Sequence, residues 1–129
     1  MPIGYFGGVS VLSATDFQKI NGFSNVFWGW GGEDDDLHHR ILFHNLTLTR
    51  PFDSQPSFIH QARYSMLDHH EAKPNPERTE LVNRGEQRLH FDGLNDISYE
   101  VLNAETKPLY TYIFVDIQQK KIINITSTG

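Results

Sequence analysis

The sequence predicts one α/β domain, or part of one, on two observations. In the first half of the chain, helix-capping residues precede apolar residues at helical spacing, and near the end two runs are rich in β-branched and aromatic residues. The 129 residues suffice for one domain with a core and are too few for two comfortable ones. We expect a domain over residues 1–117 and a polar C-terminal tail over residues 118–129.

The first expected elements are a short strand and a short helix. Residues 9–12 follow a glycine pair and have β-type composition, which favours a strand. Residues 13–16 form a capping signature, and the pair at 21–22 is typical of a helix end. About two helical turns are expected between these signals, with Phe17 and Ile20 on the apolar face.

A second helix is expected to begin at the acidic run 33–36, because carboxylates favour the first turn of a helix. Its apolar positions are Leu37, Ile41 and Leu42. Its solvent side is expected to carry mostly the side chains His38, His39, Arg40 and His44.

Beyond residue 45 the pattern predicts strands, one more helix and a turn. Strands are expected at 46–49, 57–60, 99–102 and 110–117, a helix over 77–88 with Leu81 and Val82 inward, and a turn at 92–95.

Composition excludes several functional classes. The net charge of −5 gives no basic footprint, which argues against nucleic acid as a partner. The absence of cysteine removes disulfides, thiolate nucleophiles and cysteine zinc sites. No run of about 18 apolar residues occurs. Two sequons begin at Asn45 and Asn124, and they matter only in a secretory compartment.

The most unusual stretch is residues 28–36, which read WGWGGEDDD. Its composition suits a sugar-binding, proton-moving or metal-holding site. The plain alternative is helix stabilisation, since each acid in a first turn contributes roughly 0.3–1 kcal/mol. Four successive acids also repel one another and raise some carboxyl pKa values, which favours a functional role. Glu33 and Asp36 share a helical face, and Asp34 and Asp35 point elsewhere, but spacing does not say which acid acts.

Two further features carry alternatives. Trp28 and Trp30 lie between glycines, so one of them is expected in the core, while a mobile indole suits a lid or a platform for a pyranose ring. Met66 and His69 form a second candidate site, although by chemistry alone a lone histidine is more often a surface residue and a methionine more often core filler.

The segments 5–10, 20–23, 28–36, 92–95 and 108–111 resemble, in this order, the β-1,4-galactosyltransferase family, over roughly residues 4 to 117. The resemblance implies the C-terminal half of a GT-A-like (nucleotide-diphospho-sugar transferase) fold, a mixed sheet with flanking helices and long loops. It implies transfer of galactose from UDP-galactose to the 4-hydroxyl of a terminal N-acetylglucosamine or related sugar on glycoproteins or glycolipids, with inversion and with Mn²⁺. Family members are type II proteins of the Golgi membrane that face its lumen.

The resemblance also implies roles for single residues. Asp34 is similar to the general base that takes the acceptor hydroxyl proton, with Glu33 and Asp35 orienting the acceptor and bracing the site. Trp30 is similar to the lid tryptophan. Tyr5 matches the aromatic position that selects galactose, and Gly8 part of the backbone that lines the sugar site.

The remaining roles concern the metal and the acceptor pocket. Met66 and His69 match the family's pair of metal ligands, although a thioether on manganese departs from ordinary hard–soft matching. Arg78 matches a residue of the N-acetyl pocket and Val82 a wall of it, while Thr79 stands where an aromatic residue is usual. The segment between His69 and Pro76 is shorter than in the best-known members of the family.

No Asp-x-Asp strand for a third metal ligand and the uridine site is present in this sequence. We therefore expect a fragment that is inactive alone, with any membrane contact made through an N-terminal anchor outside it. The alternatives are a non-catalytic carbohydrate-binding remnant, which would need neither donor nor metal to hold a sugar, and a partial gene product.

Overall fold

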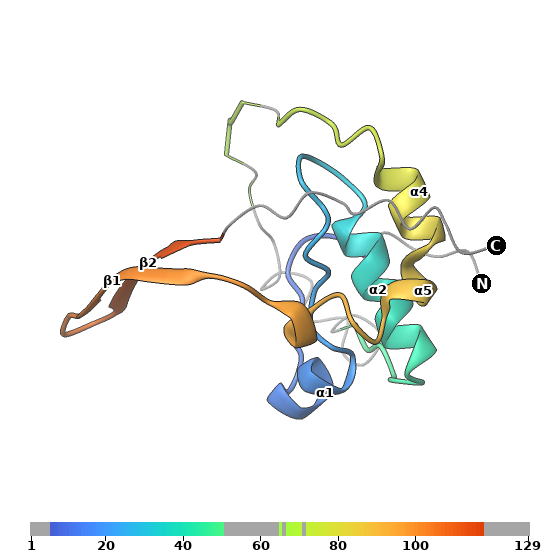
Figure 1. The fold of residues 1–129 in the computed structure, drawn as a ribbon, viewed down its shortest axis with the longest axis horizontal. Helices are drawn as coiled ribbons and strands as arrows, with labels where there is room; N and C mark the ends of the chain where they lie inside the picture. The colour runs from blue at the N-terminus through green and yellow to red at the C-terminus, as the bar shows by residue number, and fades with distance from the viewer. Residues whose placement is uncertain (1–5, 51–64, 66, 71, 118–129) are drawn as a thin grey trace.

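The computed structural model describes residues 6–50, 65, 67–70 and 72–117. Four helices, one 3₁₀ helix and two strands follow one another there: α1 (Ala14–Lys19), α2 (Glu33–Phe43), α4 (Arg78–Asn83), α5 (Gly85–Arg88), η2 (Leu94–Asp96), β1 (Glu100–Thr106) and β2 (Thr111–Asp116). Figure 1 shows α4 and α5 along one side of α2 and α1 near the C-terminal end of α2. The two strands extend away from the helices as an arm.

Helix α2 is the element around which the helical part is built. Its residues Leu37 and Ile41 lie four apart on one face and form a small core with Ile20. Phe6, Leu12 and Leu46 pack against this core from the flanking segments. Burial of these apolar groups holds α2 in place. The four acids occupy the first turn of the helix.

Helix α1 confirms the capping signals of the sequence. The Ser13 hydroxyl accepts a hydrogen bond from the Asp16 backbone amide, which satisfies one of the unpaired amides of the first turn. At the other end, Asn21 and Gly22 both have positive φ, 60° and 65°. The chain therefore reverses after α1 and leads into the loop that carries the two tryptophans.

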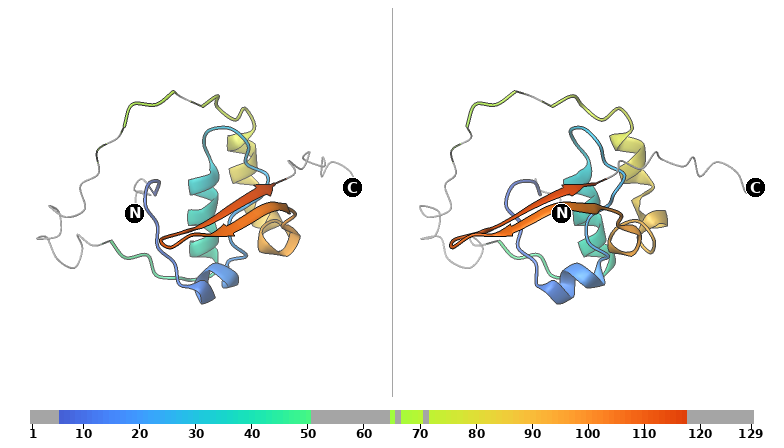
Figure 2. Two further views of the ribbon diagram at one scale, coloured as in Figure 1. Left: turned by 90° about the vertical axis from the view of Figure 1, so that its left-hand side faces the viewer. Right: turned by 60° about the vertical axis from the view of Figure 1, so that its left-hand side comes forward.

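The strands expected at 99–102 and 110–117 are present as β1 and β2, β1 continues to Thr106, and the two form an antiparallel hairpin. Glu100 pairs with Asp116 and Thr106 with Thr111, with an irregularity between Val101 and Asn103. In Figure 1 the hairpin reaches out from the helices, and in Figure 2, turned so that this side comes forward, it lies in front of α2. Apolar side chains are exposed along both strands. Within the described residues this is the one sheet, so the mixed sheet is represented there by an antiparallel pair.

Three expectations about elements were wrong. Residues 9–12 and 46–49 are not strands, and the two strands that the structure describes pair with each other. The helix over 77–88 is divided at Arg84 into α4 and α5. The expected strand at 57–60 and the tail at 118–129 lie outside the described residues.

Two expectations about the faces of α2 were also wrong. Arg40 and His38 were expected on the solvent side, but they are 0% and 7% exposed. Arg40 is buried because carboxylates surround it, and His38 because its ring stacks on Phe6 at 4.8 Å between centroids. Leu42, expected inward, is 48% exposed. Among the described residues, no helix has the length and apolar character needed to cross a membrane.

Candidate active site

The four acids occupy the first turn of α2 and differ in their surroundings. Asp36 is buried, Glu33 and Asp34 are half-buried and Asp35 is exposed. Oε2 of Glu33 is shielded from solvent and has no hydrogen-bond partner among the described residues. A buried carboxylate oxygen without a partner is costly, so this atom is suited to accept a hydrogen bond from a bound hydroxyl.

Asp34 has the electrostatics of a proton acceptor. Burial raises the pKa of its carboxyl group above the ordinary value, and the negative charges of Glu33 and Asp35 raise it further. A carboxylate with a raised pKa holds a proton more tightly, which improves it as a general base near neutral pH. These surroundings make Asp34 a candidate proton acceptor, which spacing alone could not identify.

The structure separates the two tryptophans. The Trp28 indole is half-buried, and its Nε1 donates to the Asn25 carbonyl at 3.2 Å. Trp30 is 59% exposed. The exposed indole, not the anchored one, is therefore the ring available as a lid or platform for a sugar.

The backbone of Trp30 is tied to a second loop. Its amide donates to the Lys73 carbonyl, and its carbonyl accepts from the Asn75 amide, both at 2.9 Å. These bonds make an isolated parallel bridge between Trp30 and Pro74. Gly29 permits the approach, because a Cβ there would lie 2.9 Å from the Lys73 oxygen. The exposed indole is thus presented by two loops distant in the sequence.

Arg78 joins the same site from the start of α4. Its guanidinium carbon lies 5.8 Å from the centroid of the Trp30 ring, in cation–π range, and its Nη1 donates to the Asn75 carbonyl at 3.0 Å. Its side chain also runs beside Gly31 and Gly32, where any Cβ would approach it within 3.1 Å. The structure therefore brings Arg78, Trp30 and the beginning of α2 together.

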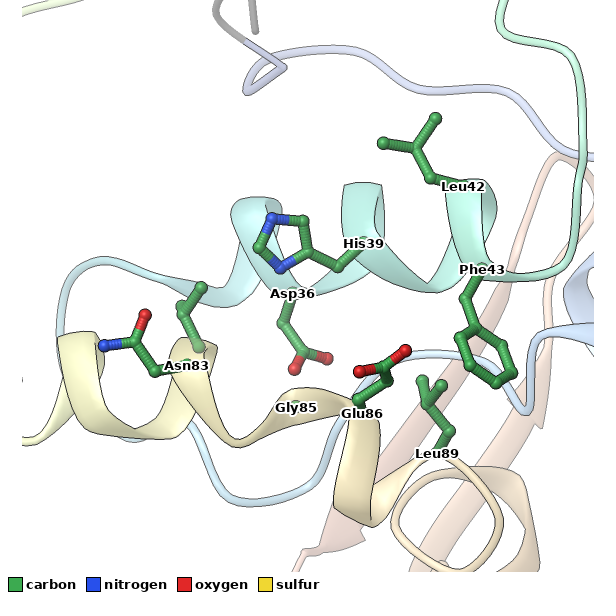
Figure 3. Close-up of a pocket in the computed structure, with 9 residues that line it drawn as sticks. Asp36, His39, Leu42, Phe43, Asn83, Gly85, Glu86 and Leu89 are labelled. Carbon is green, nitrogen blue, oxygen red and sulfur yellow. The ribbon is translucent and has the colours of Figure 1, made fainter.

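Val82 lies one helical turn after Arg78 and faces a different space. It lines a groove of about 400 Å³ between α2 and the α4–α5 segment, together with Phe43 and Leu89. Figure 3 shows Asp36 and Glu86 pointing into this groove from opposite helices. Thr79 is exposed on α4 and next to Arg78.

A buried ring of charges is the feature that the sequence reading missed. Two guanidinium groups and two carboxylates alternate in it: Arg40 Nε lies 2.7 Å from Asp36 and Arg40 Nη2 3.3 Å from Asp92, while Arg88 Nη2 lies 3.1 Å from Asp36 and Arg88 Nε 3.2 Å from Asp92. The four side chains are at most 6% exposed. Each charge has two opposite neighbours, which offsets the cost of burying it.

The ring joins α2 to the segment around residue 92. Asp92 also accepts from the Asn25 amide and the Ser24 hydroxyl, so the tryptophan-bearing loop is attached to it as well. Gly85 gives Asp36 the space it needs, because a Cβ there would lie 2.7 Å from Oδ1. One signal was available in the sequence, namely Arg40 four residues after Asp36 on one helical face.

The predicted donor and metal residues are only partly described. Tyr5 and Met66 lie outside the described residues, and His69 is exposed. Within the part of the chain that the structure describes, no three His, Cys, Asp or Glu side chains gather to hold a metal. Gly8 is exposed with φ of +107°, and a Cβ there would meet no atom within 4 Å. The described residues therefore bring the acids, Trp30 and Arg78 together without a cluster of metal ligands among them.

Comparison with known proteins gives the family. A family model described as the N-terminal domain of galactosyltransferase matches residues 3–70. The chain is 43% identical over 115 residues to β-1,4-galactosyltransferase 1 of Mus musculus and of Homo sapiens, covering 89% of this chain and 28% of each relative. To β-1,4-galactosyltransferase 4 of Cricetulus griseus it is 44% identical, covering 87% of this chain and 32% of the relative. The chain thus spans about a third or less of these relatives.

Solved structures agree on the fold. The catalytic domain of Drosophila β-1,4-galactosyltransferase 7 in complex with xylobiose superposes with a TM-score of 0.54 at 24% identity, covering 80% of this chain and 45% of that one. A mutant of that enzyme in complex with manganese, UDP-Gal and xylobiose gives a TM-score of 0.51 at 23% identity, covering 78% and 44%. These neighbours confirm part of a GT-A fold, while the position of the chain within its longer relatives stays a prediction. With the family model and the sequence relatives in agreement, the chain belongs to the β-1,4-galactosyltransferase family.

Proposed function

We propose that this chain carries the acceptor-binding and base-carrying part of an enzyme that transfers galactose from UDP-galactose to a hydroxyl of an acceptor sugar. The observation that supports it most directly is Asp34, a half-buried carboxylate whose pKa is raised by burial and by its two acidic neighbours. Asp34 lies in the first turn of α2, four residues after the exposed Trp30. Proton acceptor and sugar platform therefore belong to one short stretch.

Asp34 takes the proton of the acceptor hydroxyl as that oxygen attacks C1 of galactose. The new bond joins C1 to the acceptor oxygen, and the bond from C1 to the diphosphate oxygen breaks, so that UDP leaves with the bonding electron pair. Attack from the side opposite the leaving group inverts C1. A positioned base of this kind contributes roughly 10²- to 10⁴-fold to a rate.

The acceptor ring is proposed to lie on the Trp30 indole. The Arg78 guanidinium group lies beside the Trp30 indole and is placed to donate to a carbonyl or hydroxyl oxygen of the acceptor. The unpartnered Oε2 of Glu33 accepts from a second hydroxyl. We propose N-acetylglucosamine or a related sugar as acceptor, with exposed Thr79 leaving more room beside Arg78 than an aromatic residue would.

Manganese dependence and a Golgi lumenal location are also part of the proposal, on the resemblance and, for the metal, on the manganese and UDP-Gal in a solved neighbour. His69 would contribute one imidazole to a metal site whose other ligands lie outside the described residues. A bound manganese ion would supply positive charge to the departing diphosphate. In this proposal the chain itself supplies the proton acceptor and the acceptor-sugar contacts.

A chimera tests the proposal. The part of this chain that matches human β-1,4-galactosyltransferase 1 over 115 residues replaces the corresponding segment of that enzyme. With UDP-galactose and manganese, the purified chimera is expected to extend N-acetylglucosamine by one galactose, detected by mass spectrometry. A folded chimera that neither hydrolyses UDP-galactose nor transfers galactose to any sugar acceptor would overturn the proposal. Sugar binding without transfer would instead favour the non-catalytic carbohydrate-binding alternative.

A further inference from the structure

We propose that Asn45 is a site of N-linked glycosylation, at the end of α2 opposite the acids. Asn45-Leu46-Thr47 is one of two Asn-x-Thr sequons in the sequence, and the proposed function uses neither. The other begins at Asn124, outside the described residues. The inference rests on the proposed function only for the compartment, because sequons are modified along the secretory route.

The local backbone presents Asn45 at a tight turn that closes α2. The Leu46 amide donates to the Ile41 carbonyl at 3.1 Å, and the Asn45 amide donates to the Leu42 carbonyl at 3.0 Å. This pair of bonds, with φ of 54° at Asn45, is a Schellman motif in which asparagine takes the position that glycine usually holds. The turn explains why an asparagine is accepted here, but it requires no hydroxyl two residues later.

Exposure of the three sequon residues matches what modification needs. Asn45 and Thr47 are exposed, while Leu46 between them is half-buried and packs on the core. The Lys19 ammonium group donates to the His44 carbonyl at 3.1 Å and ties this turn to α1. Both side chains that define the sequon therefore point to solvent from a turn whose central residue is anchored.

The position of Asn45 leaves the candidate active site open. Asn45 follows Asp34 by eleven residues along and just beyond α2, which at 1.5 Å per residue is about 16 Å. Figure 1 shows the two ends of α2 facing opposite sides of the helical part. A glycan at Asn45 is thus attached at the end of α2 opposite the acids.

The transfer is balanced with a lipid-diphosphate-linked oligosaccharide as co-reactant. A bond forms between Nδ2 of Asn45 and C1 of the first N-acetylglucosamine of the oligosaccharide. The bond between that C1 and the diphosphate breaks, the lipid diphosphate leaves with the electron pair, and Nδ2 loses one proton. No oxidant or reductant is involved.

The experiment produces the 129-residue chain behind a cleavable signal peptide in insect cells, with Asn124→Gln in every variant so that only Asn45 is read. Three further changes separate the sequon from the turn. Thr47→Ala removes the sequon and leaves Asn45 unchanged, Thr47→Ser keeps the sequon, and Asn45→Gly removes it while suiting the positive φ. Treatment with peptide-N-glycosidase F and peptide mass spectrometry report occupancy.

The expected result is a glycosidase-sensitive glycan on Asn45 in the parent and in Thr47→Ser, and none in Thr47→Ala or Asn45→Gly. Unoccupied Asn45 in the secreted parent would overturn the proposal. The thermal midpoint of the Thr47→Ala chain is expected to equal that of the unglycosylated parent made in bacteria within about 2 °C, and a lower midpoint would mean that Thr47 serves the fold. Neither readout uses galactosyl transfer, so failure here leaves the proposed function standing.

Discussion

Nε of Arg40 lies 2.7 Å from a carboxylate oxygen of Asp36, one helical turn earlier on α2, and both side chains are buried. Asp36 directly follows Asp34 and Asp35 in the acidic run. Asp36 also pairs with Arg88 on α5, and Arg40 also pairs with Asp92. These contacts outside the helix fix the rotation of α2 about its own axis, with Asp36 inward, Asp34 half-buried and Asp35 exposed at the surface.

Replacing Arg40 by methionine is expected to lower the free energy of unfolding by about 3–5 kcal/mol, because Asp36 and Asp92 each lose a buried partner. Urea unfolding followed by circular dichroism measures it. The matched control is Arg84→Met, whose bond to Glu80 is exposed and whose loss is expected to cost at most about 1 kcal/mol. Equal losses of unfolding free energy in the two variants would show that the buried ring of charges does not stabilise the fold more than an exposed ion pair.

Replacing Gly29 by alanine is expected to break the bridge between Trp30 and residues 73–75, because the new Cβ would lie 2.9 Å from the Lys73 oxygen. Hydrogen exchange of the Asn75 amide, which donates to Trp30, should become faster. Gly8→Ala is the control, since Gly8 also has positive φ, +107° against +90°, but open space around its Cβ. Unchanged Asn75 exchange in Gly29→Ala would show that the loops are held together otherwise.

Replacing Asp34 by asparagine is expected to raise stability at pH 7. Folding raises the pKa of Asp34 above the ordinary 3.8, through burial and then the charges of Glu33 and Asp35, so its ionised form weakens the fold. That penalty is complete above the folded pKa and disappears as pH falls below 3.8, where Asp34 is protonated in both states. The difference in unfolding free energy between variant and parent should therefore shrink on acidification, and a constant difference would contradict it.

His38 gives the opposite dependence on pH. Burial, followed by the charges of His39 and Arg50, lowers the pKa of His38 in the folded chain. Stability is then lost as pH falls below the unfolded value of 6.5, because the unfolded chain binds the proton more readily.

His38→Phe keeps a ring to stack on Phe6 and cannot be protonated. Thermal unfolding at pH 7.5 and 5.5 should show a smaller loss in this variant than in the parent. His70→Phe, at an exposed position whose charge is not among those that act on His38, is the control and should retain the parent's loss. Identical pH dependence in His38→Phe and the parent would exclude His38 as its source.

Local signals in the sequence predicted much of the fold. The Ser13 cap, the closing pair at 21–22, the acidic start of α2 and the last two strands depend on neighbouring residues, and all are present. Burial of Arg40 and His38 could not be predicted, because their partners Asp92 and Phe6 lie far away in the sequence. The segment at 46–49 has strand composition, but composition does not supply a strand edge.

The candidate site was predictable in its members more than in its arrangement. Asp34, Trp30 and Arg78 were assigned by resemblance, and the structure places Arg78 against Trp30. Which tryptophan is anchored depends on the Trp28 bond to Asn25, and no spacing rule gives that bond. Val82 was expected in the acceptor pocket, and its lining of the groove beside α2 depends on how α4 packs.

The most direct measurement compares Asp34→Asn with Asp35→Asn in the chimera, with kcat for galactosyl transfer and the dissociation constant for N-acetylglucosamine measured for each. Asp34→Asn is expected to lower kcat by about 10²- to 10⁴-fold with little change in acceptor affinity, because the amide fills the same space but cannot take the proton. Asp35→Asn is expected to affect acceptor affinity more than kcat. A chimera with Asp34→Asn that turns over at the parent's rate would contradict the assignment of Asp34 as the base.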